Sequence, residues 1–223
     1  MRMIAEFEKM GRMSWFSHLD LQNTMQRAMR RAGLPVRYSQ GFNPHVNLAF
    51  ATALSVGLQS KCEILDVELA GEISPEEFLA RINAVLPEGL KCSRAALVED
   101  AAPALMALMT EAEYAVEAPG ADLSAAVEGF LASEEVMAEK KSKSKTRMVN
   151  IRPMVHALDC AFDGEKSVLT MILEQTNANC LKPELLLQTL APGVFCRIVR
   201  TGFYARKQDG ARVGLFEAGM DKA

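Results

Sequence analysis

The sequence predicts an α+β protein in which the same order of elements occurs twice. Short stretches with alternating apolar positions, typical of half-buried strands, are separated by stretches with the helical period of about 3.6 residues. Each half of the chain is expected to form strand, helix, strand, strand, helix, strand, which is the ferredoxin-like order. We therefore predict two tandem ferredoxin-like (β-α-β-β-α-β) units at residues 1–100 and 113–208, joined by a linker at 101–112 and followed by a loose tail at 209–223.

In the first half, a strand at 3–7 precedes a helix that begins after Ser17. Ser17 and Asp20 have the spacing of a capping box, with Asp in place of the usual Glu. The apolar stripe of this helix ends before Gly33 and Pro35, which are residues that stop helices. The other expected elements are extended segments at 36–39 and 46–54, a strand at 62–69, a helix opening at Ser74-Pro75-Glu76-Glu77 and a strand at 92–98.

The second half repeats this pattern. Asp122 is expected to cap one helix, and Lys182-Pro183-Glu184 to open another. Strands are expected at 113–117, 148–158, 167–173 and 194–204.

Composition limits the function classes. The 223 residues are 49% apolar and 24% charged, as in globular proteins, and the net charge of −3 means that any nucleic-acid contact needs a local basic patch. No signal peptide and no apolar stretch of about 18 residues is found, so we expect a cytoplasmic protein without a membrane segment. The five cysteines are far apart and form no C-x-x-C pair, which favours reduced thiols over disulfides or a metal site.

Common catalytic signatures are missing from the sequence. It has no phosphate-binding loop, no dinucleotide-binding glycine motif and no nucleophile elbow. It also has no C-x-x-x-C-x-x-C triplet to hold an iron–sulfur cluster, and its three histidines lack metal-binding spacing. These absences favour a protein without a self-sufficient active site, although an enzyme stays among the alternatives.

One stretch of the first half concentrates polar residues. On the first helix, Asp20, Thr24, Arg27 and Arg31 share the face opposite the apolar stripe, and the turn after the helix contains aromatic, amide and imidazole groups. A solvated charged face explains the helix equally well, but guanidinium groups suit phosphate, and such turns suit ligands. The candidate ligand-binding residues are Ser17, His18, Asp20, Arg27, Arg30, Arg31, Tyr38, Ser39, Gln40, Phe42, Asn43 and His45.

We expect these groups to line one concave, exposed site, because burying them without partners would be costly. His18 and His45 would lie close together if the first strands flank the first helix. They are the candidate general acid/base residues, although a lone histidine more often has a structural role.

A second candidate is a basic hairpin in the other half. Residues 140–152 carry six basic and no acidic side chains, and the final strand adds Arg197, Arg200, Arg206 and Lys207. A solvated hairpin tip is the simpler interpretation, whereas a contact with RNA would explain the concentration of charge in an acidic protein. The candidate nucleic-acid-binding residues are Lys140, Lys141, Lys143, Lys145, Arg147, Arg152, Arg197 and Arg200.

Four segments of the first half carry a family resemblance. They are Lys9-Met10-Gly11-Arg12, Trp15-Phe16-Ser17-His18-Leu19-Asp20, Arg27-Ala28-Met29-Arg30-Arg31-Ala32-Gly33-Leu34-Pro35 and Tyr38-Ser39-Gln40-Gly41-Phe42-Asn43-Pro44-His45. They resemble the radical SAM-linked family of unknown function, whose domain is fused to or encoded beside B12-binding radical SAM proteins. Asn150-Ile151-Arg152-Pro153 resembles a second marker of the family, in which an acidic residue is expected in place of Asn150.

The resemblance implies a partner rather than a reaction. We expect an accessory binding module that presents an RNA (tRNA or rRNA) or another anionic substrate to a radical SAM protein. The iron–sulfur cluster, S-adenosylmethionine and cobalamin would then belong to the partner, and this chain would hold no cofactor. The alternatives are a metal-independent RNA-processing or RNA-modifying enzyme that uses His18 or His45, and a scaffold that binds only protein.

Overall fold

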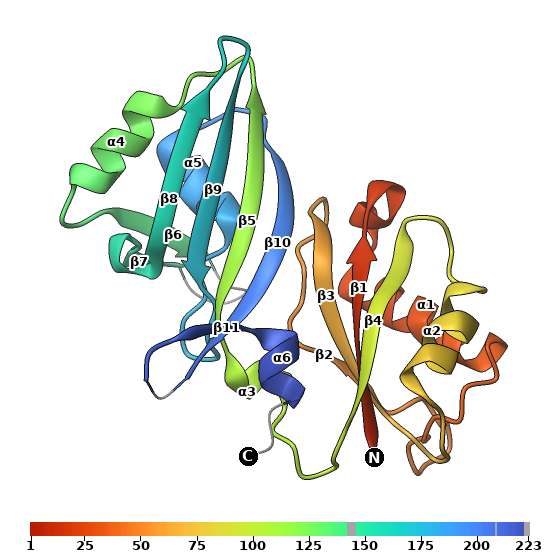
Figure 1. Ribbon diagram of the computed structural model, residues 1–223. Coiled ribbons are helices and arrows are strands. Elements are labelled where there is room, and N and C mark those ends of the chain that lie inside the picture. The colour runs from red at the N-terminus through yellow and green to blue at the C-terminus, as the bar shows by residue number, and fades with distance from the viewer. Residues whose placement is uncertain (142–145, 208, 221–223) are drawn as a thin grey trace. The chain divides into compact units, whose positions relative to one another are not determined.

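The computed structural model describes residues 1–141, 146–207 and 209–220, and only the backbone of Lys141. The protein is an α+β protein, built from antiparallel strands and several helices (Figure 1). It divides into two compact units: Met1–Met109 together with the segment from Phe203 onward form unit 1, and Thr110–Gly202 form unit 2.

Unit 1 contains an antiparallel sheet in the order β4-β1-β3, and the short strand β2 pairs with β3. Its strands are β1 (Arg2–Lys9), β2 (Leu48–Phe50), β3 (Gln59–Glu68) and β4 (Leu90–Val98). In the register of the central strand, Ala5 lies between Leu65 of β3 and Ala95 of β4. The extended segments expected at 36–39 and 46–54 are shorter than predicted, with isolated bridges from Val36 and Tyr38 in addition to β2.

Two helices pack on one face of this sheet through a shared apolar core (Figure 1). They are α1 (His18–Arg31) and α2 (Pro75–Asn83), and a short 3-10 helix, η1 (Gly11–Trp15), precedes α1. Leu21, Met25 and Met29 of α1 are buried, which confirms the predicted apolar stripe. They meet Phe7 of β1 and Phe78 of α2, which are fully buried in the same core.

Three short elements complete unit 1. They are α3 (Leu105–Leu108), β11 (Arg212–Gly214) and α6 (Leu215–Met220), and α6 contacts α3, β1 and β4. The predicted loose tail at 209–223 is therefore wrong for residues 212–220, because Leu215 and Phe216 are buried. The backbone of α6 lies close to Leu105 of α3 because Gly219 has no side chain. A Cβ at position 219 would lie 2.6 Å from Leu105 Cδ2.

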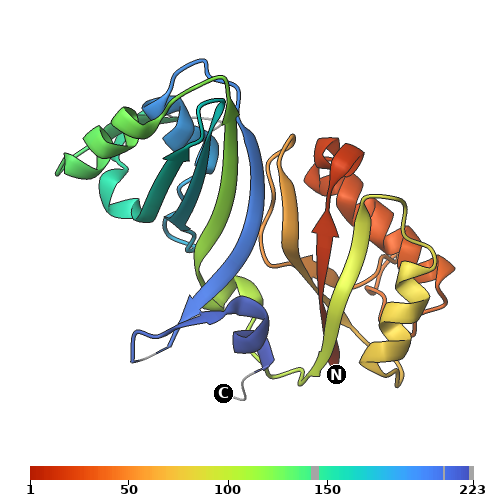
Figure 2. The ribbon, with the colours of Figure 1, turned by 45° about the horizontal axis from the view of Figure 1, so that its top comes forward.

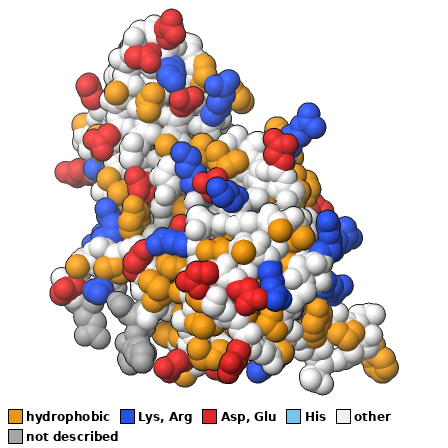
Figure 3. All heavy atoms as spheres, turned by 45° about the vertical axis from the view of Figure 1, so that its right-hand side comes forward, with side chains coloured by type: hydrophobic (Ala, Val, Ile, Leu, Met, Phe, Trp, Pro, Cys, Tyr) orange, Lys and Arg blue, Asp and Glu red, His pale blue; other side chains and the backbone are white. Residues whose placement is uncertain are grey.

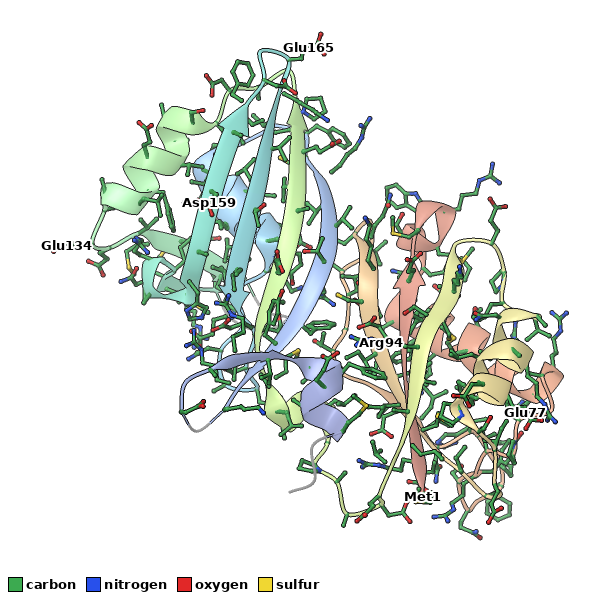
Figure 4. All side chains as sticks on the ribbon, in the orientation of Figure 1. Met1, Glu77, Arg94, Glu134, Asp159 and Glu165 are labelled. Atoms are coloured by element: carbon green, nitrogen blue, oxygen red, sulfur yellow. The ribbon has the colours of Figure 1, made fainter. Side chains whose placement is uncertain are left out.

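Arg94 of β4 links α6 to the sheet through an ion pair with Glu217 (Figure 4). Its Nε and one terminal nitrogen donate to the carboxylate of Glu6 at 2.9 and 2.8 Å, and the other terminal nitrogen donates to Glu217. The guanidinium also lies 4.2 Å from the ring centre of Phe216. The hydrogen bonds to Glu6 are the main reason that the pKa of Arg94 is raised further above its usual value.

In unit 2, four strands pair in the order β10-β5-β9-β8, and the pairings of β5 with β9 and of β8 with β9 are antiparallel. These strands are β5 (Met109–Pro119), β8 (Val155–Phe162), β9 (Lys166–Glu174) and β10 (Arg197–Arg206), of which β10 ends in unit 1. The helices α4 (Ser124–Ala132) and α5 (Pro183–Leu190) lie side by side (Figure 2). A separate two-stranded hairpin consists of β6 (Met137–Lys141) and β7 (Thr146–Asn150).

Three predicted boundaries differ from the structure. The strand expected at 148–158 is divided into β7 and β8 by the 3-10 helix η2 (Arg152–Met154), because Pro153 lacks a backbone N–H for a ladder. Asp122 does not cap α4 directly: the N-cap is Leu123, and the Asp122 carboxylate accepts a hydrogen bond from the Ser124 N–H. The expected linker contains α3, and its last residues, from Met109, already belong to β5.

Candidate functional site

The start of α1 is a complete capping box, as predicted. Ser17 Oγ accepts a hydrogen bond from the Asp20 N–H at 3.2 Å, and the Asp20 carboxylate accepts one from the Ser17 N–H at 3.1 Å. Ser17 Oγ also donates to Asp20 at 2.7 Å, and this bond is the main reason that the pKa of Asp20 lies below its usual value. Ser17 and Asp20 therefore stabilise the N-terminus of α1, which is a structural role.

Replacing Ser17 by alanine should lower the free energy of unfolding by about 1 kcal/mol, because the cap at the helix N-terminus is lost. Denaturant unfolding measures this loss, and Ser17→Asp should recover most of it because aspartate is also a good N-cap. A Ser17→Ala protein with full stability but weaker ligand binding would instead make Ser17 a contact residue.

The last two turns of α1 present three exposed arginines, Arg27, Arg30 and Arg31. Arg30 donates to the Pro44 carbonyl at 3.3 Å, and its guanidinium lies 5.7 Å from the ring centre of Tyr38. Among the described residues, no carboxylate forms an ion pair with Arg27 or Arg31. Two guanidinium groups on this helix are therefore available to an anion.

The turn after α1, residues 38–46, is closed at its base and exposed at its end; we call it the 38–46 loop. Tyr38 and Val46 form a bridge, and the Ser39 N–H donates to the His45 carbonyl at 2.8 Å. Ser39 Oγ accepts from the His45 N–H at 3.1 Å and lies 2.9 Å from His45 Nδ1. At the other end, the side chain of Phe42 is 106% exposed, and Gln40 and Asn43 are exposed beside it.

His18 and His45 do not form one site. His18 is the first residue of α1, where its ring lies 5.4 Å from that of Phe50. The 38–46 loop is tied to Arg30, twelve residues later and about 18 Å along the helix axis. The predicted single concave site is therefore wrong, since it divides into a capping cluster at one end of α1 and an arginine-and-loop cluster at the other.

In unit 2, the predicted nucleic-acid-binding residues have different surroundings. Arg147 is exposed, Lys140 donates to the Cys180 carbonyl at 2.8 Å, and Arg197 is exposed, 3.8 Å from Glu117. Arg152 is half-buried, with its guanidinium 5.6 Å from the ring centre of Phe130. Lys143, Lys145 and the side chain of Lys141 lie outside the described residues.

Arg200 was predicted to bind nucleic acid at the surface, but its side chain is buried. Its side chain is only 3% exposed, and two of its nitrogens lie 3.4 and 3.3 Å from the Tyr114 hydroxyl. Alternation along β10 places Arg200 on the buried side, whereas Arg197, three residues earlier, lies on the open side. Arg200 is therefore not on the surface that an RNA would contact.

Two further features were not predicted. A hollow of about 640 Å³ lies between β6 and α5, and Lys140 and Lys182 contribute to its wall. Near the start of α1, Trp15 and Leu19 are 72% and 67% exposed, although their residue types favour a core. Periodicity along the chain does not reveal either feature, because both depend on which segments meet in the fold.

Comparison with known proteins gives a family. The chain matches, over residues 2–183, the family described as "Uncharacterized protein conserved in bacteria (DUF2344)". The protein belongs to the DUF2344 family. No curated protein matches it.

Several solved structures resemble this DUF2344 protein in fold. One of them is a chain of the "Crystal Structure of a Cbf5-Nop10-Gar1 Complex", with 11% sequence identity and a TM-score of 0.51. The alignment covers 90% of this chain and 48% of the other, so the present chain spans about half the length of that relative. At this identity the likeness concerns the α+β fold alone.

The described residues do not contain a cluster of three or more His, Cys, Asp or Glu side chains placed to hold a metal ion. Among the described helices, none has the length and apolar character needed to cross a bilayer. Cys92 is deeply buried, and this burial raises the pKa of its thiol to about 12.

Proposed function

We propose that this DUF2344 protein is a binding module that holds an RNA on the arginine face of α1 and the 38–46 loop. The observation that carries the proposal is the pair of exposed guanidinium groups of Arg27 and Arg31, with which no described carboxylate forms an ion pair. Like charges four residues apart on a helix cost roughly 0.2–0.5 kcal/mol. The helix dipole offsets part of this cost, and an anionic ligand supplies a reason for the pair.

Local charge matters here because the whole protein is acidic. The net charge is −3, and on the face seen in Figure 3 the Lys and Arg side chains lie among Asp and Glu. An RNA would therefore be attracted by clusters rather than by the bulk charge. In unit 2, Arg147 of the hairpin is exposed, but the β6–α5 hollow is lined by Glu139 and Glu184 as well as by Lys140 and Lys182, so the proposal rests on the arginines of α1.

The partner in this proposal is a radical SAM protein of the B12-binding type. Its support is the sequence resemblance, above all the segment Ser39-Gln40-Gly41-Phe42-Asn43-Pro44-His45. The partner would supply the iron–sulfur cluster, S-adenosylmethionine and cobalamin, while this chain would position the RNA. Purifying the two proteins together and sequencing the RNA that accompanies them tests this part.

We also infer that each unit is a ferredoxin-like variant. When the strands of each unit are numbered along the chain and the hairpin β6–β7 is left out, the strand orders β4-β1-β3-β2 and β10-β5-β9-β8 both follow the pattern 4-1-3-2. In unit 2, the hairpin β6–β7 is then an insertion between the first helix and the second strand.

A second candidate function is metal-independent RNA processing or modification. The observation that favours it is the hydrogen bond between Ser39 Oγ and His45 Nδ1, a contact that also occurs between nucleophile and base in active sites. Cleavage or modification of RNA by the purified protein alone would favour this function. A protein-only scaffold is the third candidate, and it requires that no RNA binds even at low salt.

Replacing both Arg27 and Arg31 by alanine should weaken RNA binding about tenfold at low salt. Removing two phosphate contacts should also lower the slope of log affinity against log salt concentration by about 1.4, because each contact with a single strand contributes about 0.7. Fluorescence anisotropy with a labelled RNA across a salt series measures both quantities.

The matched control is Arg81→Ala on α2, since Arg81 is also an exposed helix arginine but is paired with Glu77. It should leave the affinity and the salt slope unchanged. Each substitution of Arg27 or Arg31 should change the free energy of unfolding by no more than about 0.5 kcal/mol. Unchanged affinity together with a large loss of stability would make the arginine cluster structural.

A further inference from the structure

The structure points to a narrower ligand class: we infer that the RNA is bound where its bases are unpaired, and that one base stacks on Phe42. This inference rests on the proposed function, since it concerns the same loop. The first observation is the exposure of the ring, 106%, compared with 72% for Trp15 and 68% for Phe195. An aromatic ring with both faces in water is available for stacking.

The second observation is that the ring is held on a short, closed span. The Tyr38–Val46 bridge, the Ser39–His45 hydrogen bonds and the Arg30–Pro44 hydrogen bond fix both ends of the 38–46 loop. Only residues 40–44 lie between the Ser39–His45 contacts. Because the base of the loop is already ordered, binding loses less conformational entropy than binding to an open loop would.

The third observation is the chemistry around the ring. Gln40 and Asn43 flank Phe42 with exposed amide groups, which can donate to and accept from the edges of a base. Arg30 lies at the base of the loop, with its guanidinium near Tyr38 and its neighbour Arg31 exposed. A stacking ring, amides for the base edge and cations for the backbone are the groups with which proteins bind single-stranded RNA.

The same observations disfavour other occupants. In a duplex the bases are already stacked on each other, so a ring on a loop would find no free base face. The buried centre of a protein–protein interface is usually apolar, so a protein partner that buried Phe42 should find other apolar side chains around it. Residues 40–45 contain no aliphatic side chain apart from Pro44.

The test compares a single-stranded RNA with a duplex of the same sequence by anisotropy at low salt. Phe42→Ala should weaken binding of the single strand about 5- to 150-fold, because one stacked base contributes about 1–3 kcal/mol. Phe42→Trp should restore the affinity for the single strand. The duplex should bind more weakly than the single strand, with the same affinity for the unaltered protein, Phe42→Ala and Phe42→Trp. The control is Phe162→Ala, since Phe162 is also an exposed aromatic residue but lies next to Asp163.

A direct readout uses the fact that Trp15 is the sole tryptophan of the sequence. In the double variant Trp15→Phe/Phe42→Trp, the tryptophan at position 42 is the only one, and stacking with a base should quench its fluorescence. Single-stranded RNA should quench it strongly, whereas the duplex should not.

The outcomes separate the two proposals. If Arg27→Ala/Arg31→Ala weakens binding while Phe42→Ala binds single strands as the natural protein does, the stacking inference is overturned and the proposed function stands. Equal loss of single-strand and duplex binding in Phe42→Ala also overturns stacking. If the unaltered protein binds no RNA at low salt, the proposed function fails, and the inference fails with it.

Discussion

Replacing Gly89 by alanine should lower the free energy of unfolding by about 3 kcal/mol, through two effects that act together. Gly89 has a φ of +89°, a conformation that costs an alanine roughly 1–2 kcal/mol. A Cβ at this position would also lie 2.6 Å from the Met10 carbonyl oxygen, which is backbone and cannot rotate away. The Met10 N–H donates to the Gly89 carbonyl at 2.8 Å, so the two segments are held together. Denaturant unfolding measures the loss.

The matched control is Gly120→Ala. Gly120 also has a positive φ, +72°, but a Cβ there would meet nothing within 4 Å. This variant should lose only the conformational part, roughly 1–2 kcal/mol. Equal losses for the two variants would show that the contact with Met10 is relieved by a small shift of the backbone.

Replacing Arg94 by methionine should lower the free energy of unfolding by about 2–3 kcal/mol. The apolar stem of the side chain is kept, but the Glu6 carboxylate, whose side chain is only 16% exposed, loses both hydrogen bonds. Glu217 also loses its hydrogen bond from Arg94, and the ring of Phe216 loses the guanidinium beside it. The helix α6 should therefore separate from β4 more readily. Hydrogen exchange of the α6 amides provides a second measurement, and unchanged protection there would contradict the assigned role.

Two variants make the Arg94 result specific. Arg81→Met, which removes an exposed ion pair with Glu77, should cost no more than about 1 kcal/mol. Adding Glu6→Gln to Arg94→Met should recover part of the loss, because the remaining partner then carries no charge.

The same cluster should make unit 1 weaker in acid. Burial acts to raise the pKa of Glu217, but its hydrogen bond from Arg94 leaves that pKa below the usual glutamate value. A depressed carboxyl pKa stabilises the fold fully above the unfolded pKa, and this stabilisation is lost as the pH falls through the lower, folded value.

Local signals were sufficient to predict α1. Ser17 and Asp20 are three residues apart and form the cap, the apolar stripe of Leu21, Met25 and Met29 is buried, and the helix ends before Gly33. Exposure of the arginines also followed from the helical period, because a stripe that faces the core places the opposite face in water.

Features that depend on long-range contacts could not be predicted in this way. The 38–46 loop contacts α1 through Arg30 rather than near His18, and the sequence gives no sign of this. The helix at Leu215–Met220 contacts α3, β4 and β1, which lie from about one hundred to about two hundred positions earlier in the chain. A six-residue helix is too short to show a period, so a loose tail was the natural expectation. Arg200 was misplaced because a basic residue on a strand gives no sign of which side is buried.

The position of α6 in the chain has a consequence for biosynthesis. Ile4 of β1 and Leu105 of α3 are covered by α6, whose last residue, Met220, is more than a hundred positions after Leu105. At a translation rate of roughly 5–20 residues per second, the ribosome needs several seconds to make the intervening chain. During that interval the apolar surface that α6 will cover is open to chaperones, and unit 1 can reach its final stability only after unit 2 has been synthesised.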